Sequence, residues 1–221
     1  MEEKHVFLTG SSGGGKTSHL KMMYRDHDGI AVWVNHGDRS AGLPGWIERV
    51  ESFEAIARRI EACESIEEVR SLRLIYDCPS DTAAIAPLKR LAKRVSDHFS
   101  NRVCTLIAVD ECAPLLPDDD EDSARENNPL AWLFHEGRDL NCKVAVATQD
   151  PGEVSYTPVK NLKWLVWAGK SKMFHRGFKQ YWGLQDLDLP RENHKYVVMD
   201  PLDPPEIVYK GETDPEPFDQ Y

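Results

Sequence analysis

The stretch Val6-Phe-Leu-Thr-Gly10-Ser-Ser-Gly-Gly-Gly-Lys16-Thr17 decides the fold of this 221-residue chain. Its apolar start predicts a strand over His5–Thr9, and the residues after it have helical spacing over Gly15–Arg25. The segment between follows the pattern G-x-x-x-x-G-K-T, in which glycines let backbone N–H groups turn inward toward a polyphosphate. A strand, a phosphate-binding loop and a helix in this order predict an α/β nucleotide-binding fold.

This loop supplies the candidate nucleotide-binding residues. Lys16 is expected to reach the β- and γ-phosphates of ATP, and the Thr17 hydroxyl to coordinate Mg²⁺. The full candidate set for the nucleotide is Gly10, Ser11, Ser12, Gly13, Gly14, Gly15, Lys16, Thr17 and Ser18. The alternative is a glycine-rich turn that only joins a strand to a helix, and the flanking elements disfavour it.

Short apolar runs alternate with helical stretches along the rest of the chain. Further strands are predicted at Ile30–Asn35, Leu72–Tyr76, Cys104–Val109, Lys143–Ala147 and Trp164–Ala168, and helices at Glu48–Ala62, Ala83–Phe99 and Ala124–Leu140. This alternation predicts a mostly parallel central sheet with helices on both faces. We expect one such domain over residues 1–200, and then an acidic, proline-rich tail over residues 201–221 with an edge strand at Glu206–Tyr209.

Polar residues follow two of these strands. Asp110 is expected to hold Mg²⁺, and Glu111 to polarise the attacking water as a general base, although a helix cap or an exposed strand end would also explain the pair. Gln149 ends the next strand and would sense the γ-phosphate or orient water; a lone glutamine there is more often an ordinary loop residue. Ligands of open α/β sheets bind outside the carboxyl ends of the strands, so Gly10, Asp110 and Gln149 should converge.

Composition narrows the class of protein. The net charge of -10 argues against a surface that is basic all over. Five cysteines without a C-x-x-C pair favour neither a disulfide framework nor a zinc site and indicate a reducing compartment. No apolar run approaches the roughly 18 residues that span a bilayer.

Two segments differ from the rest of the chain in charge and composition. Residues 154–185 contain no Asp or Glu and combine Lys and Arg with aromatic side chains, which fits phosphate contacts in a DNA-binding pore or aromatic packing in the core. The acidic run Pro117–Asp122 is predicted to be a solvated surface loop.

Together these motifs resemble the FtsK/HerA superfamily of pumping ATPases. The resemblance rests on Gly10–Thr17, Leu106–Glu111 and His135–Pro151, and a strand at Leu72–Tyr76 agrees with the additional-strand, catalytic-glutamate layout of that family. In the family, an arginine near the end of the helix before the glutamine strand enters the neighbouring subunit's site. The resemblance therefore implies that Arg138 is a catalytic arginine acting in trans, while an ordinary cation at a helix C-terminus is the alternative.

Within the superfamily, a chain of this size without a membrane helix or appended domain is similar to genome-packaging ATPases of icosahedral viruses that contain an internal membrane. The resemblance implies ATP and Mg²⁺ as cofactors, a homo-oligomeric ring, sequence-independent binding of double-stranded DNA, and a capsid vertex as the docking site. Such a protein works in the host cytoplasm or on the virion. The alternatives are an assembly ATPase of the filamentous-phage type and a non-enzymatic nucleotide-dependent switch or structural vertex protein.

Overall fold

The computed structural model describes residues 5–36, 42–78, 85–116, 128–154, 162–170, 176–201 and 204–213. The strands are β1 (Val6–Gly10), β2 (Gly29–His36), β3 (Glu48–Val50), β4 (Arg73–Cys78), β5 (Cys104–Val109), β6 (Cys142–Ala147), β7 (Trp164–Ala168), β8 (Lys195–Asp200) and β9 (Glu206–Glu212). The α-helices are α1 (Lys16–Arg25), α2 (Phe53–Glu61), α3 (Ile66–Ser71), α4 (Ala86–Phe99), α6 (Pro129–Glu136) and α8 (Arg176–Tyr181). Short 3-10 turns are η2 (Ala113–Leu115), η3 (Gly137–Leu140) and η4 (Pro151–Glu153).

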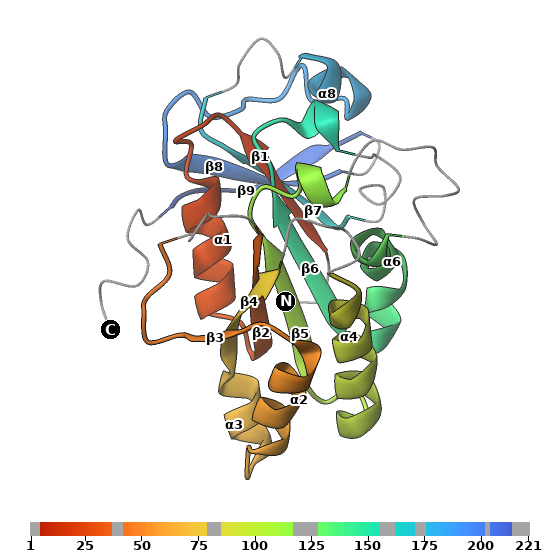
Figure 1. The fold of residues 1–221 in the computed structure, drawn as a ribbon. Helices are drawn as coiled ribbons and strands as arrows, with labels where there is room; N and C mark the ends of the chain where they lie inside the picture. The colour runs from red at the N-terminus through yellow and green to blue at the C-terminus, as the bar shows by residue number, and fades with distance from the viewer. Residues whose placement is uncertain are drawn as a thin grey trace.

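The strands form one sheet in the order β3-β4-β2-β5-β6-β1-β7-β8-β9 (Figure 1). β1 to β7 pair in parallel, whereas β8 runs antiparallel to β7 and β9 antiparallel to β8. Every residue of β1, β2 and β5 is buried, as expected for parallel strands with helices over both faces. The predicted mostly parallel α/β sheet is confirmed.

Helices cover the two faces of the sheet unequally. α1 packs on one face through Leu20 and Tyr24. The other face carries α2, α3, α4 and α6, which bury Ile56, Leu88 and Leu133 among other residues. Figure 1 shows α1 on one side of the strands and α4 and α6 on the opposite side. Among the described residues, α1 is the main helix on its face of the sheet.

One strand separates the phosphate-loop strand from the strand that carries the acidic pair. That strand is β6, which pairs with β1 on one side and with β5 on the other. β4, the strand predicted at Leu72–Tyr76, lies beyond β2 and away from β1. The additional-strand layout is present. The strand that lies between the loop strand and the acid strand is β6, which ends just before Thr148, and not β4.

Some predicted elements need correction. The helix predicted over Glu48–Ala62 is wrong at its start, because residues 48–50 form β3 beside β4 and the helix begins only at Phe53. The Ser52 side chain accepts a hydrogen bond from Ala55 N, and this cap sets the start of α2. α3, α8 and β8 were not predicted. The described part of the helix expected over residues 124–140 is α6 followed by η3, and the acidic run Pro117–Asp122 lies outside the described residues.

The C-terminal part of the described chain completes the sheet. β9 is its edge strand, as predicted for Glu206–Tyr209, and extends to Glu212. Thr213 follows it and is buried, with its backbone N–H donating to His194 O. Within the described ranges, no helix is both long and apolar enough to cross a bilayer.

Candidate nucleotide site

The phosphate loop is held in a shape that requires glycine. Gly10 has φ 134°, and a Cβ there would lie 1.9 Å from the Ala168 carbonyl oxygen of β7. Gly15 has φ 99°, and a Cβ there would lie 2.4 Å from Thr213 Oγ1. β7 and the residue after β9 therefore pack against the back of the loop, and side chains at these glycines would push it away.

The loop surrounds the ammonium group of Lys16. This side chain is only 6% exposed, and its Nζ donates to Ser11 O at 2.8 Å and to Gly10 O at 3.2 Å. Ser11 Oγ is buried and makes no hydrogen bond to any described residue. Ser12 and Gly13 are exposed at the loop tip, and Ser18 lies half-buried in the first turn of α1. A buried cation, an unpartnered hydroxyl and an exposed glycine-rich tip fit a polyphosphate.

The start of α1 contacts the end of β5 directly. Thr17 Oγ1 donates a hydrogen bond of 2.8 Å to Asp110 Oδ2, so a hydroxyl and a carboxylate meet beside the loop. Burial raises the pKa of Asp110, and the hydrogen bond from Thr17 partly offsets that shift. Hard oxygen donors of this kind fit Mg²⁺.

Glu111 leaves β5 with an uncommon backbone conformation and reaches toward β6. Its φ is 56°, in the left-handed region. Thr148 Oγ1 donates to Glu111 Oε1 at 2.7 Å, and Gln149 N donates to Oε2 at 3.3 Å. Gln149 thus meets the acid through its backbone, while its residue as a whole is exposed. The structure brings Gly10, Asp110 and Gln149 to the same edge of the sheet.

Arg138 lies at the opposite end of the strands, close to the amino end of β6. It belongs to η3, whose first residue Gly137 packs against the His5 ring; a Cβ on Gly137 would lie 3.3 Å from His5 Cε1. The positive charge of Arg138 also contributes, after burial, to lowering the pKa of His5. His5 precedes β1 and Gly10 ends it, so roughly 16 Å of strand separates Arg138 from its own phosphate loop.

Two residues of the site were not assigned a role from sequence. Thr148 holds the Glu111 carboxylate, and His36, the last residue of β2, places Nε2 2.9 Å from the Asp110 carbonyl oxygen. Both are polar residues at the carboxyl ends of strands adjacent to β5, on either side of it. The signal lies in that position, which becomes readable only when the strand order is known.

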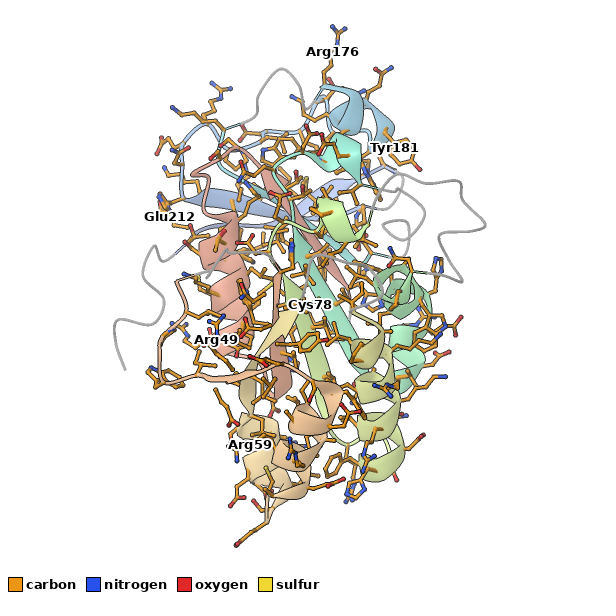
Figure 2. The ribbon with its side chains drawn as sticks, viewed as in Figure 1. Arg49, Arg59, Cys78, Arg176, Tyr181 and Glu212 are labelled. Atoms are coloured by element: carbon orange, nitrogen blue, oxygen red, sulfur yellow. The ribbon has the colours of Figure 1, made fainter. Side chains whose placement is uncertain are left out.

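The basic, aromatic segment, residues 154–185, contributes side chains both to the core and to the surface. Trp167 and Phe178 are buried, and the Phe178 ring stacks on Phe7 with centroids 5.9 Å apart, as aromatic core packing predicts. Figure 2 shows Arg176 and Tyr181 of α8 directed away from the body of the chain. Residues 155–161 and 171–175 of this segment lie outside the described ranges.

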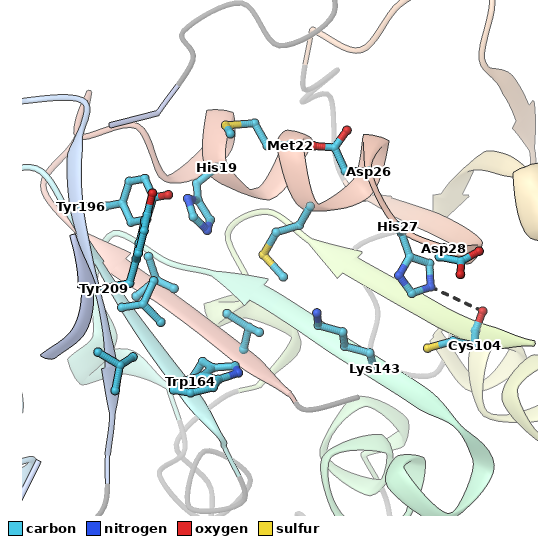
Figure 3. A pocket seen from close by; sticks show the side chains of 15 residues that line it. His19, Met22, Asp26, His27, Asp28, Cys104, Lys143, Trp164, Tyr196 and Tyr209 are labelled. Atoms are coloured by element: carbon cyan, nitrogen blue, oxygen red, sulfur yellow. Dashed lines mark hydrogen bonds between the residues drawn. The ribbon is translucent and has the colours of Figure 1, made fainter. Parts of the chain in front are cut away.

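A cavity of about 860 Å³ lies on the α1 face of the sheet (Figure 3). His19, Trp164 and Tyr196 line it together with Lys143, and His27 at its rim approaches the Cys104 carbonyl oxygen at 3.4 Å. None of the predicted nucleotide, metal or catalytic residues lines this cavity. The cavity and the phosphate loop are therefore separate places on the molecule.

The sheet order, the loop and the paired acids define the P-loop NTPase fold with one strand between the loop strand and the acid strand. Among solved structures, this chain is similar to the genome packaging NTPase B204 from Sulfolobus turreted icosahedral virus 2. The B204 complex with AMPPCP matches with a TM-score of 0.66 and 12% identity, covering 94% of this chain and 97% of B204. The complex with ATP-gammaS matches with a TM-score of 0.67, again at 12% identity, covering 92% and 96% of the two chains.

The structure of EssC (ATPases 2 and 3) from Geobacillus thermodenitrificans has a TM-score of 0.53 at 12% identity, covering 99% of this chain and 42% of EssC. At these identities the likeness concerns the fold, and it is the fold expected from the FtsK/HerA resemblance. No protein-family model and no curated protein matches the sequence.

Proposed function

We propose that this chain hydrolyses ATP and uses the energy to move double-stranded DNA during viral genome packaging. The observation that carries the proposal is that a lysine, a hydroxyl–carboxylate pair and a second carboxylate lie together at the carboxyl ends of the strands. Lys16 and Thr17 begin α1, Thr17 bonds Asp110, and Glu111 follows Asp110 directly. A phosphate-binding cation, a pair of metal-binding oxygens and a base next to them are the parts that phosphoryl transfer to water requires.

In this proposal each residue has a separate task. Lys16 exchanges the loop carbonyls that it now contacts for the β- and γ-phosphates, and loop N–H groups bind the remaining phosphate oxygens. Thr17 and Asp110 would hold Mg²⁺, which would supply positive charge beside the phosphates. Glu111 accepts the proton of the attacking water, and the Thr148 and Gln149 contacts orient its carboxylate.

We assign Arg138 to the site of a neighbouring subunit. Arg138 lies at the amino ends of the strands, away from the phosphate loop of its own chain. It can therefore contact a bound nucleotide only if that nucleotide is held by a second copy of the chain. A ring of identical subunits supplies that geometry at every interface. The arginine would then stabilise the charge that develops on the transferring phosphoryl group.

Two separate observations support the DNA-packaging part of the proposal. B204, which shares the fold over nearly its whole length, is a genome packaging NTPase. The acid-free segment 154–185 places Arg176 and Lys170 in exposed positions on an otherwise acidic chain, as phosphate contacts without base recognition require. We propose double-stranded DNA as substrate, a homo-oligomeric ring, and action at a capsid vertex in the host cytoplasm or on the virion.

The test is ATP turnover measured with and without duplex DNA at several salt concentrations. The proposal predicts Mg²⁺-dependent turnover that rises when duplex DNA of any sequence is added, and an effect that weakens as salt increases. ATP binding without turnover, with or without DNA, would favour a nucleotide-dependent switch instead. Turnover that does not change with DNA at any salt concentration would support ATP hydrolysis and contradict DNA translocation.

A further inference from the structure

The backbone carbonyl of Asp110 has a partner outside the sheet ladder. The β2–β5 ladder ends at the pair Val34 and Val109, so the next carbonyl along β5 meets no strand partner on this side. His36 fills the place: its Nε2 lies 2.9 Å from the Asp110 carbonyl oxygen, and the residue is only 7% exposed. Because a carbonyl only accepts, the Nε2 atom carries the proton.

The peptide held in this way leads into Glu111. On the opposite side, the same turn is bonded to β6: Cys112 N donates to Ala147 O at 2.8 Å. Glu111 lies between these two anchors in the left-handed region, at φ 56°. Residues other than glycine keep such a conformation only where their surroundings fix it. The hydrogen bonds of Asp110 O and Cys112 N therefore lie directly before and directly after this residue.

We propose that His36 is a positioning residue for Glu111. Its imidazole holds the Asp110 carbonyl, the carbonyl fixes the left-handed turn, and the turn sends the Glu111 carboxylate toward Thr148 at the end of β6. His36 itself touches no reacting atom, and it acts through the backbone. The inference rests on the proposed role of Glu111 as the base.

His36 differs in this respect from its sequence neighbour. Asn35 Nδ2 donates to Asp77 Oδ1, and Asp77 in turn binds Arg49, so that contact ties β2 to β4 and β3. Of these two side-chain contacts, that of His36 is the one directed to the residue after β5, where the acidic pair begins.

The test compares two isosteric variants, His36→Gln and His36→Met. Glutamine carries an Nε2–H donor at a similar reach, whereas methionine has the same length and no donor. We expect His36→Met to lower kcat about 10- to 100-fold, because a small displacement of a catalytic group costs this much. KM and the dissociation constant of a non-hydrolysable ATP analogue should change less than about threefold, because the phosphate loop is not touched. His36→Gln should keep most of the wild-type kcat.

The chain offers a matched control in His27. Its Nε2 also approaches a β5 carbonyl, that of Cys104 at 3.4 Å, but at the other end of the strand. His27→Met should leave kcat unchanged, with thermal unfolding recorded for all variants to separate folding from catalysis. Equal kcat in His36→Gln and His36→Met, or a kcat in His36→Met within twofold of wild type, would overturn the inference.

Failure of the proposed function has a different signature. Turnover that survives in Glu111→Gln would remove Glu111 as the base, whatever the His36 variants do. Loss of turnover in Glu111→Gln together with full activity in His36→Met would remove only the role of His36.

Discussion

The Thr148 hydroxyl donates a 2.7 Å hydrogen bond to the Glu111 carboxylate, across from the end of β6 to the end of β5. The second carboxylate oxygen accepts from Gln149 N at 3.3 Å. The candidate base is therefore oriented by the strand that stands between it and the phosphate-loop strand, which ties the position of the acid to that of the loop.

Replacing Thr148 tests this orientation. Thr148→Val keeps the shape of the side chain but removes the donor, so the Glu111 carboxylate loses one of its two contacts with the residues that follow β6. We expect kcat for ATP to fall about tenfold with an unchanged KM, since the lost contact orients the base and does not bind the nucleotide. Thr148→Ser should retain activity because it keeps a hydroxyl. Wild-type kcat in Thr148→Val would show that this hydrogen bond does not contribute.

Mixing subunits tests the assignment of Arg138. Arg138→Ala and Glu111→Gln proteins should each be inactive alone, and a mixture of the two should regain turnover. In a randomly mixed ring about a quarter of the interfaces would join an intact Glu111 to an intact Arg138. Arg102, an exposed arginine also near the amino end of β5, provides the control, because Arg102→Ala should be active by itself. A mixture no more active than its parts would contradict the assignment.

Gly15→Ala tests the packing behind the phosphate loop. The added methyl would lie 2.4 Å from Thr213 Oγ1 at a backbone φ of 99°. We expect the free energy of unfolding to fall by about 1–3 kcal/mol and nucleotide affinity to weaken, because the loop must move to relieve the contact. Urea unfolding and titration with an ATP analogue measure the two effects. Gly177→Ala, where no atom lies within 4 Å of the new methyl, should be neutral or slightly stabilising.

Stability should depend on pH through His5. Burial, helped by the charges of Arg138, His135 and Lys143, lowers the pKa of His5 from 6.5 to about 4 in the folded chain. The unfolded chain therefore takes up a proton at a pH where the folded chain does not, and stability is lost as pH falls from about 6.5 toward 4. The contribution between pH 7 and pH 5 is about 2 kcal/mol.

His5→Asn isolates this contribution. The Asn side-chain oxygen can accept the hydrogen bond that Val144 N now gives to His5 Nδ1, but it does not titrate. Urea unfolding at pH 7 and pH 5 should show a smaller loss of stability in this variant than in the wild type. The exposed His98 serves as the control, and His98→Asn should keep the wild-type loss. An equal loss in His5→Asn would exclude His5 as the source.

The sequence predicted the elements whose signals are local. Residues 6–17 contain a strand, a glycine-rich loop and a helix start in one run, and Asp110 follows a buried strand, so their meeting place was predictable. β3 was not predicted, because Glu48–Val50 is short and half polar and becomes a strand only through its pairing with β4. The contacts of His36 and Thr148 depend on the strand order, which places β2 and β6 on either side of β5. A sequence does not contain that order in any local pattern.

The most direct test of the account is ATP turnover by Glu111→Gln, compared with the wild type, together with equilibrium binding of ATP to both proteins. If Glu111 is the base, turnover should fall by about 10²- to 10⁴-fold, while the dissociation constant for ATP stays within a few fold, because the phosphate loop and the Thr17–Asp110 pair are unchanged. Turnover at the wild-type rate in Glu111→Gln would contradict it.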